Sequence, residues 1–310
     1  MLFKKSISMD PILVTGINGF LGSHLSDYFI NTGVKVYGIS HGIYKSSGVK
    51  IIDNDILTTK NLPNEISTIL HFAALTDVQY CEKNHLECFE TNVKGTKNIL
   101  DLARKNDSNV IFASSSHVYG KPETLPISEN TPLNPISVHA KSKVEGELLC
   151  EKYTELYGMN ISIIRTFSIF GPRSPSYSLI SRIINQILNN KKIILGNLES
   201  KRDFLHISDF LTAIEILIKN PIEGCSKINI GSGKNFSVNQ ICEMLFEISQ
   251  TSNSIQIDQK LIRKNDIDEL LCDNSKLKKL GWFPKLSFND GLKQVFNHFE
   301  SNYKQLSQYS

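Results

Sequence analysis

The segment from Ile12 to Gly22 constrains the fold of this chain more than any other. A short apolar run leads into a loop with glycines at Gly16, Gly19 and Gly22, and an amphipathic stretch follows at once. This order predicts a strand, a tight turn and the N-terminus of a helix. Phosphate binds well at such a place, because the first helical N–H groups have no internal acceptor and the helix dipole is positive there.

Each of the three glycines has its own expected role. Gly16 allows the sharp turn, Gly19 lets a pyrophosphate approach the backbone, and Gly22 lets the helix press against the strand. The pattern alone also fits an ordinary turn, but its place between a strand and a helix favours dinucleotide binding. The predicted cofactor contacts in this loop are Gly16, Asn18, Gly19, Phe20, Leu21 and Gly22.

Composition and charge argue against several classes of function. The 310 residues carry a net charge of +3, which gives no electrostatic case for nucleic acid or an anionic membrane. No apolar run approaches the roughly 20 residues of a spanning helix, and the basic start lacks the apolar stretch of a signal peptide. The six cysteines form no C-x-x-C pair or cysteine–histidine cluster, so no metal site is predicted. We expect a cytoplasmic protein.

Short apolar runs alternate with helical stretches through the first half of the chain. This alternation predicts an α/β fold, a Rossmann-type doubly wound parallel sheet. The expected strands are residues 11–15, 34–40, 50–53, 68–73, 110–114 and 161–167, and the expected helices are 23–32, 82–105 and 142–157. Beyond Gly171 the alternation loosens. We predict a dinucleotide-binding Rossmann domain over residues 1–170 and a smaller C-terminal α/β lobe over residues 171–310 that binds the substrate.

Further motifs follow the glycine loop in a fixed order. They are the strand end His71–Ala74, the segment Ser114–Gly120, the run Lys201–Asp209 and the tetrapeptide Gly281–Pro284. Together they resemble the extended short-chain dehydrogenase/reductases, in the family of nucleotide-sugar epimerases and dehydratases, almost from end to end. Within that family, residues 171–175 and 196–204 look most like GDP-4-keto-6-deoxy-mannose reductases.

The resemblance implies a nicotinamide cofactor. Beyond the glycine loop, its expected contacts are Ser40, His41, Asp55, Ile56, Ala73, Ala74 and Lys143. Asp55 stands where the family reads the adenine amino group. At the end of the second strand, Ser40 and His41 offer neither a carboxylate for a 2′-hydroxyl nor an arginine, although they could accommodate a 2′-phosphate. The choice between NAD and NADP stays open, with a preference for NADP.

The resemblance also implies a catalytic set with one departure. Ser115 occupies the catalytic Ser/Thr position, from which its hydroxyl could bond the reacting oxygen, and Lys143 would hold the nicotinamide ribose. The tyrosine expected four residues before that lysine is replaced by His139, and no tyrosine of the chain has a lysine four residues later.

The chemistry of His139 differs from that of a tyrosine. A phenol starts near pKa 10, whereas an imidazole starts near 6.5. The cation of Lys143 would lower the histidine pKa further, so His139 suits taking a proton from an alcohol better than giving one to a ketone. Three interpretations stay open. His139 is the proton shuttle, or it is only a polar filler in a weakened site, or the chain binds a nucleotide sugar without turnover.

Other departures concern the substrate. The family's dehydratases have Asp and Glu after the catalytic serine, where this chain has Ser116 and His117, and this argues against a 4,6-dehydratase. An asparagine expected near the substrate diphosphate is Ser168 here. Arg202 and Arg263 match arginines that the family places on the diphosphate, although Arg263 also fits a solvated charge cluster. Ser116, Ser168, Arg202 and Arg263 are the predicted substrate contacts.

These patterns predict an NAD(P)-dependent nucleotide-sugar oxidoreductase, foremost a 4-ketosugar reductase acting on a GDP-linked deoxysugar for a surface polysaccharide. A 4-epimerase is the first alternative, since it needs the same oxidation before the ketosugar rotates and is reduced. A non-catalytic nucleotide-sugar-binding protein is the second. The family commonly dimerises through the two long helices, here residues 82–105 and 142–157, so a homodimer is expected.

Overall fold

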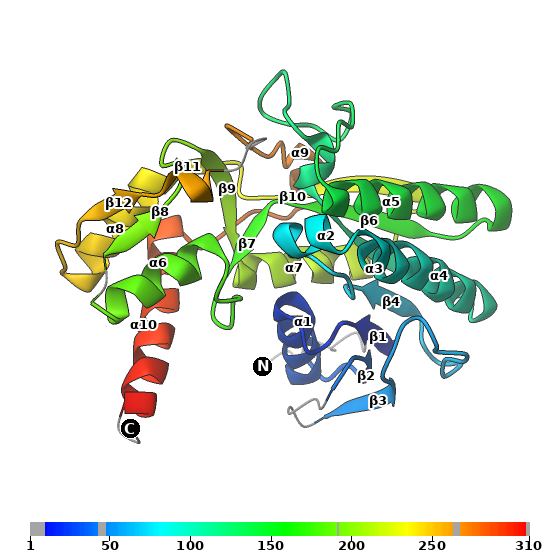
Figure 1. Cartoon of the computed structure of the whole chain (residues 1–310). Coiled ribbons are helices and arrows are strands. Elements are labelled where there is room, and N and C mark those ends of the chain that lie inside the picture. The colour runs from blue at the N-terminus through cyan, green and yellow to red at the C-terminus, as the bar shows by residue number, and fades with distance from the viewer. Residues whose placement is uncertain (1–9, 43–47, 191, 263–266, 308–310) are drawn as a thin grey trace. The chain divides into compact units, whose positions relative to one another are not determined.

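A computed structural model describes residues 10–42, 48–190, 192–262 and 267–307 (Figure 1). Within these ranges, a parallel sheet of seven strands has the order β10-β6-β5-β4-β1-β2-β3. The strands are β1 (Ile12–Thr15), β2 (Val36–Ile39), β3 (Val49–Asp53), β4 (Thr68–His71), β5 (Asn109–Ser115), β6 (Ile161–Thr166) and β10 (Cys225–Ile230). The predicted Rossmann-type sheet is confirmed.

The strand order reverses at β1. This strand pairs with β2 on one side and with β4 on the other, both in parallel. All residues of β1, β2 and β4 are buried, as expected for a parallel sheet that helices cover on both faces. The carboxyl end of β1 therefore lies at the switch point of the sheet, where open α/β folds bind their ligands.

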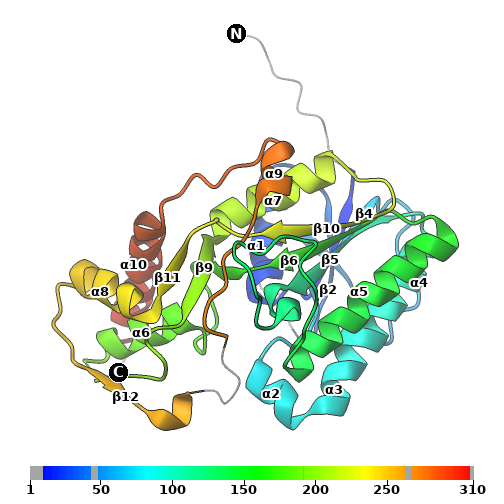
Figure 2. The same ribbon diagram turned by 90° about the horizontal axis from the view of Figure 1, so that it is seen from above.

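Two helices cover one face of the sheet. Figure 2 shows α4 (Gly95–Lys105) beside α5 (Val138–Tyr157) along that face. Side chains such as Leu102 and Tyr153 pack into one core with alternate strand residues. At Gly146 of α5, a Cβ atom would lie 2.5 Å from the ring of Phe112, so this glycine lets α5 approach β5 closely.

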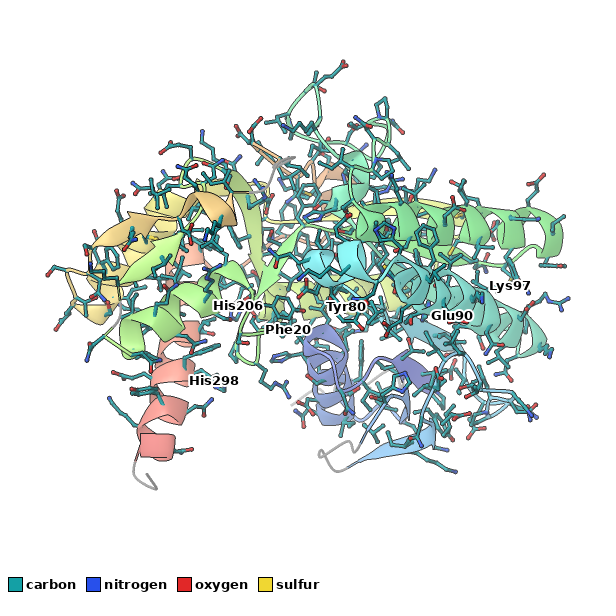
Figure 3. All side chains as sticks on the ribbon, viewed as in Figure 1. Phe20, Tyr80, Glu90, Lys97, His206 and His298 are labelled. Carbon is teal, nitrogen blue, oxygen red and sulfur yellow. The ribbon has the colours of Figure 1, made fainter. Side chains whose placement is uncertain are left out.

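The single helix expected over residues 82–105 is wrong. The chain forms α2 (Val78–Lys83), α3 (His85–Phe89), a π-helical turn η1 (Glu90–Lys94) and α4. Figure 3 labels Tyr80 and Glu90 on these short segments. The helix starts early because the Asp77 carboxylate accepts the N–H groups of residues 79 and 80, and it breaks where Asn84 leaves the helical region, at φ −130° and ψ 59°.

Helix α5 also begins earlier than expected. Its first residue is Val138 rather than Ser142, because the Ser137 hydroxyl accepts the N–H of Ala140 and caps the helix. His139 therefore lies in the first turn of α5. Lys143 follows one turn later on the same face.

Contacts group the chain into two compact units. The first unit comprises Met1–Val118, Pro135–Arg165 and Ile214–Ile228, and the second comprises Tyr119–Asn134, Thr166–Ala213 and Asn229–Ser310. The chain thus returns to the first unit within α7 (Ile207–Lys219). The assignment of cofactor binding to residues 1–170 and of substrate binding to residues 171–310 stays a prediction.

The second unit has smaller sheets and its own core. A three-stranded sheet has the order β11 (Asn235–Ser237), β9 (Lys201–His206) and β7 (Ser168–Phe170), and β8 (Ile193–Leu195) pairs with β12 (Ile255–Ile257). Helices α6 (Leu179–Leu188), α8 (Val238–Ser249) and α10 (Phe288–Ser307) pack together around buried apolar residues. Among the described helices, none is both long and apolar enough to cross a bilayer.

Two of the family-like motifs hold this second unit together. The buried Asp203 carboxylate accepts backbone N–H groups from Ser232, Gly233 and Cys272 at 2.7–3.1 Å. The Asp209 carboxylate accepts the N–H groups of residues 285 and 286, and its carbonyl oxygen accepts the indole N–H of Trp282 at 3.1 Å. The aspartates of Lys201–Asp209 thus fix loops that are distant in sequence.

Replacing Gly22 by alanine should destabilise the first unit. An added Cβ would lie 2.3 Å from the carbonyl oxygen of Gly16, so helix and loop must separate, at about 3 kcal/mol of unfolding free energy. Gly33→Ala is the matched control. Its φ of 83° disfavours alanine by about 1 kcal/mol, but its Cβ would meet no atom within 4 Å. Urea unfolding of both variants measures the difference, and equal losses would contradict the packing argument.

Candidate active site

The glycine loop has the geometry of a tight turn into a helix. Gly16 has a φ of 69°, and a Cβ on it would lie 2.8 Å from the Cα of Ala73, so only glycine fits between the two strand ends. The N–H of Gly19 bonds the carbonyl oxygen of Gly16 at 2.8 Å and closes the turn. Gly19 is then the N-cap of α1 (Phe20–Asn31).

The start of α1 fits a phosphate group. Figure 3 shows Phe20 at this end of the helix. The N-cap is a glycine without a capping side chain, and the first turn contains no acidic residue. The first N–H groups of a helix lack intrahelical acceptors, so an anionic ligand is the natural partner for them. The residues present thus fit a dinucleotide diphosphate.

The end of β2 is tied to this loop. The side-chain amide of Asn18 donates to the carbonyl oxygen of His41 at 2.6 Å, and the largely buried Ser40 hydroxyl donates to the same oxygen at 3.1 Å. The exposed imidazole of His41 has its Nε2 3.7 Å from a carboxylate oxygen of Asp55. Asp55 precedes Ile56, which is buried against Gly95 of α4. A carboxylate therefore stands close to the side chain that was expected to receive a 2′-phosphate.

His71 is buried and bonded on both ring nitrogens. Its Nδ1 lies 2.8 Å from Oγ1 of Thr15, and its Nε2 lies 3.0 Å from Oγ1 of Thr96. The Thr96 hydroxyl donates to the carbonyl oxygen of Asn92 at 2.6 Å, so it accepts from Nε2–H. Thr15 then donates to Nδ1. Burial, and next the charge of Lys143, lowers the pKa of His71 to about 3, which keeps this ring neutral.

This hydrogen-bond chain continues from β4 to α5. The Thr15 hydroxyl also accepts the N–H of Ala73 at 3.0 Å, which orders the strand end that precedes Ala74. The side-chain amide of Asn92 donates to the Ser142 hydroxyl at 2.9 Å, and Ser142 donates to the carbonyl oxygen of His139 at 2.8 Å. The glycine loop and the first turn of α5 are therefore joined by buried side chains.

The structure brings the three expected catalytic residues together in the first unit. Ser115 ends β5 half-buried, and its Oγ accepts the N–H of His117 at 3.2 Å. The Nζ of Lys143 donates to the carbonyl oxygen of Ala113 at 2.7 Å, which ties α5 to β5 two residues before the serine. Burial lowers the pKa of Lys143 to about 8, so the amine is mostly charged at neutral pH.

The imidazole ring of His139 is buried. Its exposed fraction is 5%, and among the described residues neither ring nitrogen has a hydrogen-bond partner. Burial first, then the charges of Lys143 and His117, lower its pKa to about 3. The ring is thus neutral at physiological pH. Because buried polar atoms are nearly always bonded, two orphaned nitrogens beside Lys143 indicate a place that a ligand completes.

A buried ion pair next to this site was not predicted from the sequence. Glu147 lies one turn after Lys143 on α5, and its carboxylate bonds the Arg165 guanidinium at 2.6 Å with exposed fractions of 2% and 1%. The Ser114 hydroxyl donates to the same carboxylate at 2.5 Å. Two features of the sequence could have indicated this pair. Glu147 follows Lys143 by four residues, and Arg165 lies inside an otherwise apolar strand. The pair ties α5 to β6, and the Ser114 bond ties it to β5, the strand that ends at Ser115.

The expected substrate contacts fall in different parts of the chain. Ser116 is buried at the start of the 3₁₀ turn η2 (Ser116–Tyr119) in the first unit. Ser168 is half-buried in β7 of the second unit, and Arg202 lies in β9, where its Nη1 bonds the carbonyl oxygen of Lys201 at 2.9 Å. Arg263 lies outside the described residues.

The sequence matches a family and curated relatives along almost its whole length. The family described as GDP-mannose 4,6 dehydratase matches residues 13–295. A putative UDP-glucose 4-epimerase of Methanocaldococcus jannaschii is 33% identical, over 94% of this chain and 99% of the relative. A UDP-glucuronate 4-epimerase of Thermodesulfobacterium geofontis is 30% identical, over 95% of this chain and 97% of the relative.

Solved structures agree with these relatives. The UDP-glucuronic acid 4-epimerase of Bacillus cereus, solved with UDP-glucuronic acid and NAD, is 28% identical with a TM-score of 0.86, over 96% of this chain and 99% of that chain. The UDP-N-acetylglucosamine 4-epimerase of Methanobrevibacter ruminantium, in complex with UDP-N-acetylmuramic acid, is 25% identical with a TM-score of 0.87, over 96% and 100%.

Fold and site define a dinucleotide-binding α/β protein of the short-chain dehydrogenase/reductase class. More particularly, the chain belongs to the extended family of NAD-dependent nucleotide-sugar epimerases and dehydratases. These relatives and structural neighbours are enzymes.

Replacing His139 by phenylalanine should stabilise the protein. Removing two unpaired buried nitrogens is expected to raise the free energy of unfolding by about 1–3 kcal/mol at pH 7.5. The gain should grow on acidification. An unfolded histidine binds a proton below about pH 6.5, whereas folded His139 resists until about pH 3, so the wild type loses stability in that window.

At pH 5 the advantage of His139→Phe should exceed its advantage at pH 7.5 by about 2 kcal/mol. Urea unfolding at the two pH values measures both quantities. A variant with the same advantage at both pH values would show that His139 takes up a proton in the folded state as readily as in the unfolded state.

Proposed function

We propose that this protein is an NAD-dependent nucleotide-sugar 4-epimerase. The observation that carries the proposal is the neutral, buried imidazole of His139 beside Lys143. A neutral imidazole can accept the proton of an alcohol as the hydride leaves, and the imidazolium that forms returns the proton readily because its pKa is low. The direction of proton flow therefore separates an epimerase from a reductase.

An epimerase needs no net proton uptake at this residue. His139 takes the proton of the sugar C4 hydroxyl as the alcohol is oxidised and returns it to the ketone oxygen after the sugar has turned. The imidazolium exists only between these two steps. A reductase must instead start each turnover with a protonated shuttle, and burial next to Lys143 disfavours that form of His139 at neutral pH.

The other residues of the site take supporting roles. The Ser115 hydroxyl would donate a hydrogen bond to the reacting oxygen. Lys143, held by the carbonyl oxygen of Ala113, would bond the nicotinamide ribose and place its charge beside His139. The glycine loop and the start of α1 would hold the diphosphate of NAD, which supplies the acceptor and donor of the C4 hydride.

NAD is proposed over NADP, although the sequence favoured NADP. The Ser40 hydroxyl already donates to the carbonyl oxygen of His41, and the Asp55 carboxylate stands 3.7 Å from the His41 ring. That negative charge suits a neutral 2′-hydroxyl better than a 2′-phosphate. The solved complexes of similar proteins with NAD support the same choice.

A UDP-linked sugar is the proposed substrate, with Ser116, Ser168, Arg202 and Arg263 as its expected contacts. The named activities of the relatives on UDP-sugars support this choice. The GDP-linked 4-ketosugar reductase is the second candidate. The description of the matching family supports the GDP-linked sugar, and the segments at residues 171–175 and 196–204 resemble such reductases.

Activity assays separate these candidates. The purified protein is incubated with NAD and UDP-glucose, UDP-N-acetylglucosamine or UDP-glucuronate, and the sugars are resolved by chromatography. We expect conversion to the C4 epimer without a net change in absorbance at 340 nm. GDP- and dTDP-linked 4-ketosugars with NADH or NADPH test the reductase, which would oxidise the reduced cofactor. Binding of nucleotide sugar without either reaction would contradict both proposals.

His139→Ala should lower kcat about 100-fold or more while NAD binding is retained, because loss of a positioned general base removes that much rate. The matched control is His298→Ala on α10, which Figure 3 labels and which belongs to the second unit. Wild-type turnover in His139→Ala would leave His139 as a polar filler only.

A homodimer through α5 is also proposed. Its outer face carries Leu148 and Leu156 with exposed fractions of 51% and 56%, and such apolar side chains favour a helix-to-helix contact. Light scattering of the wild type should give twice the 34.9 kDa chain mass, and Leu148→Glu with Leu156→Glu should give a monomer. Lys293→Glu, at an exposed polar position of α10, is the control. A monomeric wild type would overturn the proposal.

A further inference from the structure

Two departures from the family pattern meet in the structure. His139 takes the place of the catalytic tyrosine, and His117 takes the place of the glutamate found in the dehydratases. They lie 22 residues apart in the sequence, in α5 and η2. Yet their ring centroids are 6.1 Å apart with an interplanar angle of 85°, so one ring presents its edge to the face of the other. Aromatic rings attract each other in this arrangement.

The orientation of His139 needs such a neighbour. A histidine works as a base only if one nitrogen faces the reacting proton, and in most sites a hydrogen bond at the other nitrogen sets the ring. His71 illustrates this, since both of its nitrogens are bonded. Among the described residues, His139 has no such bond, so its ring plane must be fixed by packing.

His117 is well placed to provide that packing. Its backbone N–H bonds the Oγ of Ser115 at 3.2 Å, which links the turn that carries it to the end of β5. The backbone of His139 is held from the other side, where its carbonyl oxygen accepts the Ser142 hydroxyl at 2.8 Å. The ring contact therefore connects two segments whose backbones are already fixed.

We infer that His117 is a positioning residue, whose ring holds the imidazole of His139 in the orientation that faces the substrate hydroxyl. The inference rests on the proposed role of His139 as the proton shuttle. It extends that role by treating His117 and His139, the two departures from the family pattern, as one functional pair. An aromatic ring at position 117 substitutes for the hydrogen bond that usually orients a catalytic histidine.

For this role, the side chain at position 117 must be a flat ring, and it does not need to gain or lose a proton. His117→Ala should lower kcat about tenfold, because the freed ring of His139 samples unproductive orientations. The KM for the nucleotide sugar, NAD binding and the thermal midpoint should stay near the wild-type values. His117→Phe keeps a ring but cannot carry a proton, and it should restore most of kcat.

The outcomes separate this inference from the proposed function. If His139→Ala keeps full activity, the proposed shuttle fails and the positioning role fails with it. If His139→Ala is inactive while His117→Ala turns over like the wild type, only the positioning role is overturned. If His117→Phe is as slow as His117→Ala although both are folded, His117 acts through its own nitrogens and the inference is also overturned.

NMR of the imidazole groups gives a readout that does not depend on turnover. In the wild type, the long-range nitrogen–proton spectrum should show His139 as a neutral ring with one narrow set of signals. In His117→Ala, we expect the His139 signals alone to shift and broaden as the ring samples other orientations, and in His117→Phe to return. Unchanged His139 signals in His117→Ala would overturn the inference.

Discussion

The site depends on one chain of buried hydrogen bonds. It runs from the Thr15 hydroxyl through the ring of His71 to Thr96, and from Asn92 through Ser142 to the carbonyl oxygen of His139. Every link has a defined donor, which requires His71 to be neutral. Burial lowers the pKa of His71 to about 3 and secures that state. The chain thereby holds the glycine loop, the end of β4 and the first turn of α5 in one rigid arrangement.

His139 is the exception within this ordered surrounding. His71 is buried and satisfied, whereas His139 is buried with two unbonded nitrogens among the described residues. Burial of unpaired polar atoms reduces stability, and proteins retain such features where function needs them. Lys143 further disfavours the protonated form of His139, since a backbone carbonyl holds its charge near the histidine ring. Both effects favour an imidazole that holds a proton only briefly.

Much of the fold could be predicted from local sequence, whereas less of the candidate site could. The strand β1, the glycine turn and α1 were predictable, because the residues that form a tight turn and begin a helix are close neighbours in the sequence. The early starts of α2 and α5 were missed, because the short side chains of Asp77 and Ser137 cap these helices by accepting backbone N–H groups. The Glu147–Arg165 pair was also missed, since its partners are 18 residues apart and meet only when α5 packs on the sheet.

The sequence by itself determined the Rossmann-type sheet, the glycine turn and the presence of a histidine four residues before Lys143. These features depend on residue type and short spacing, which the chain carries in any conformation. Only the tertiary structure decided that the ring of His139 is buried with no hydrogen bond from any described residue, and that His117 lies against this ring. Burial and ring contact depend on how β5, η2 and α5 pack together. The same packing sets the pKa of His139, so the chemistry of the site is a property of the fold.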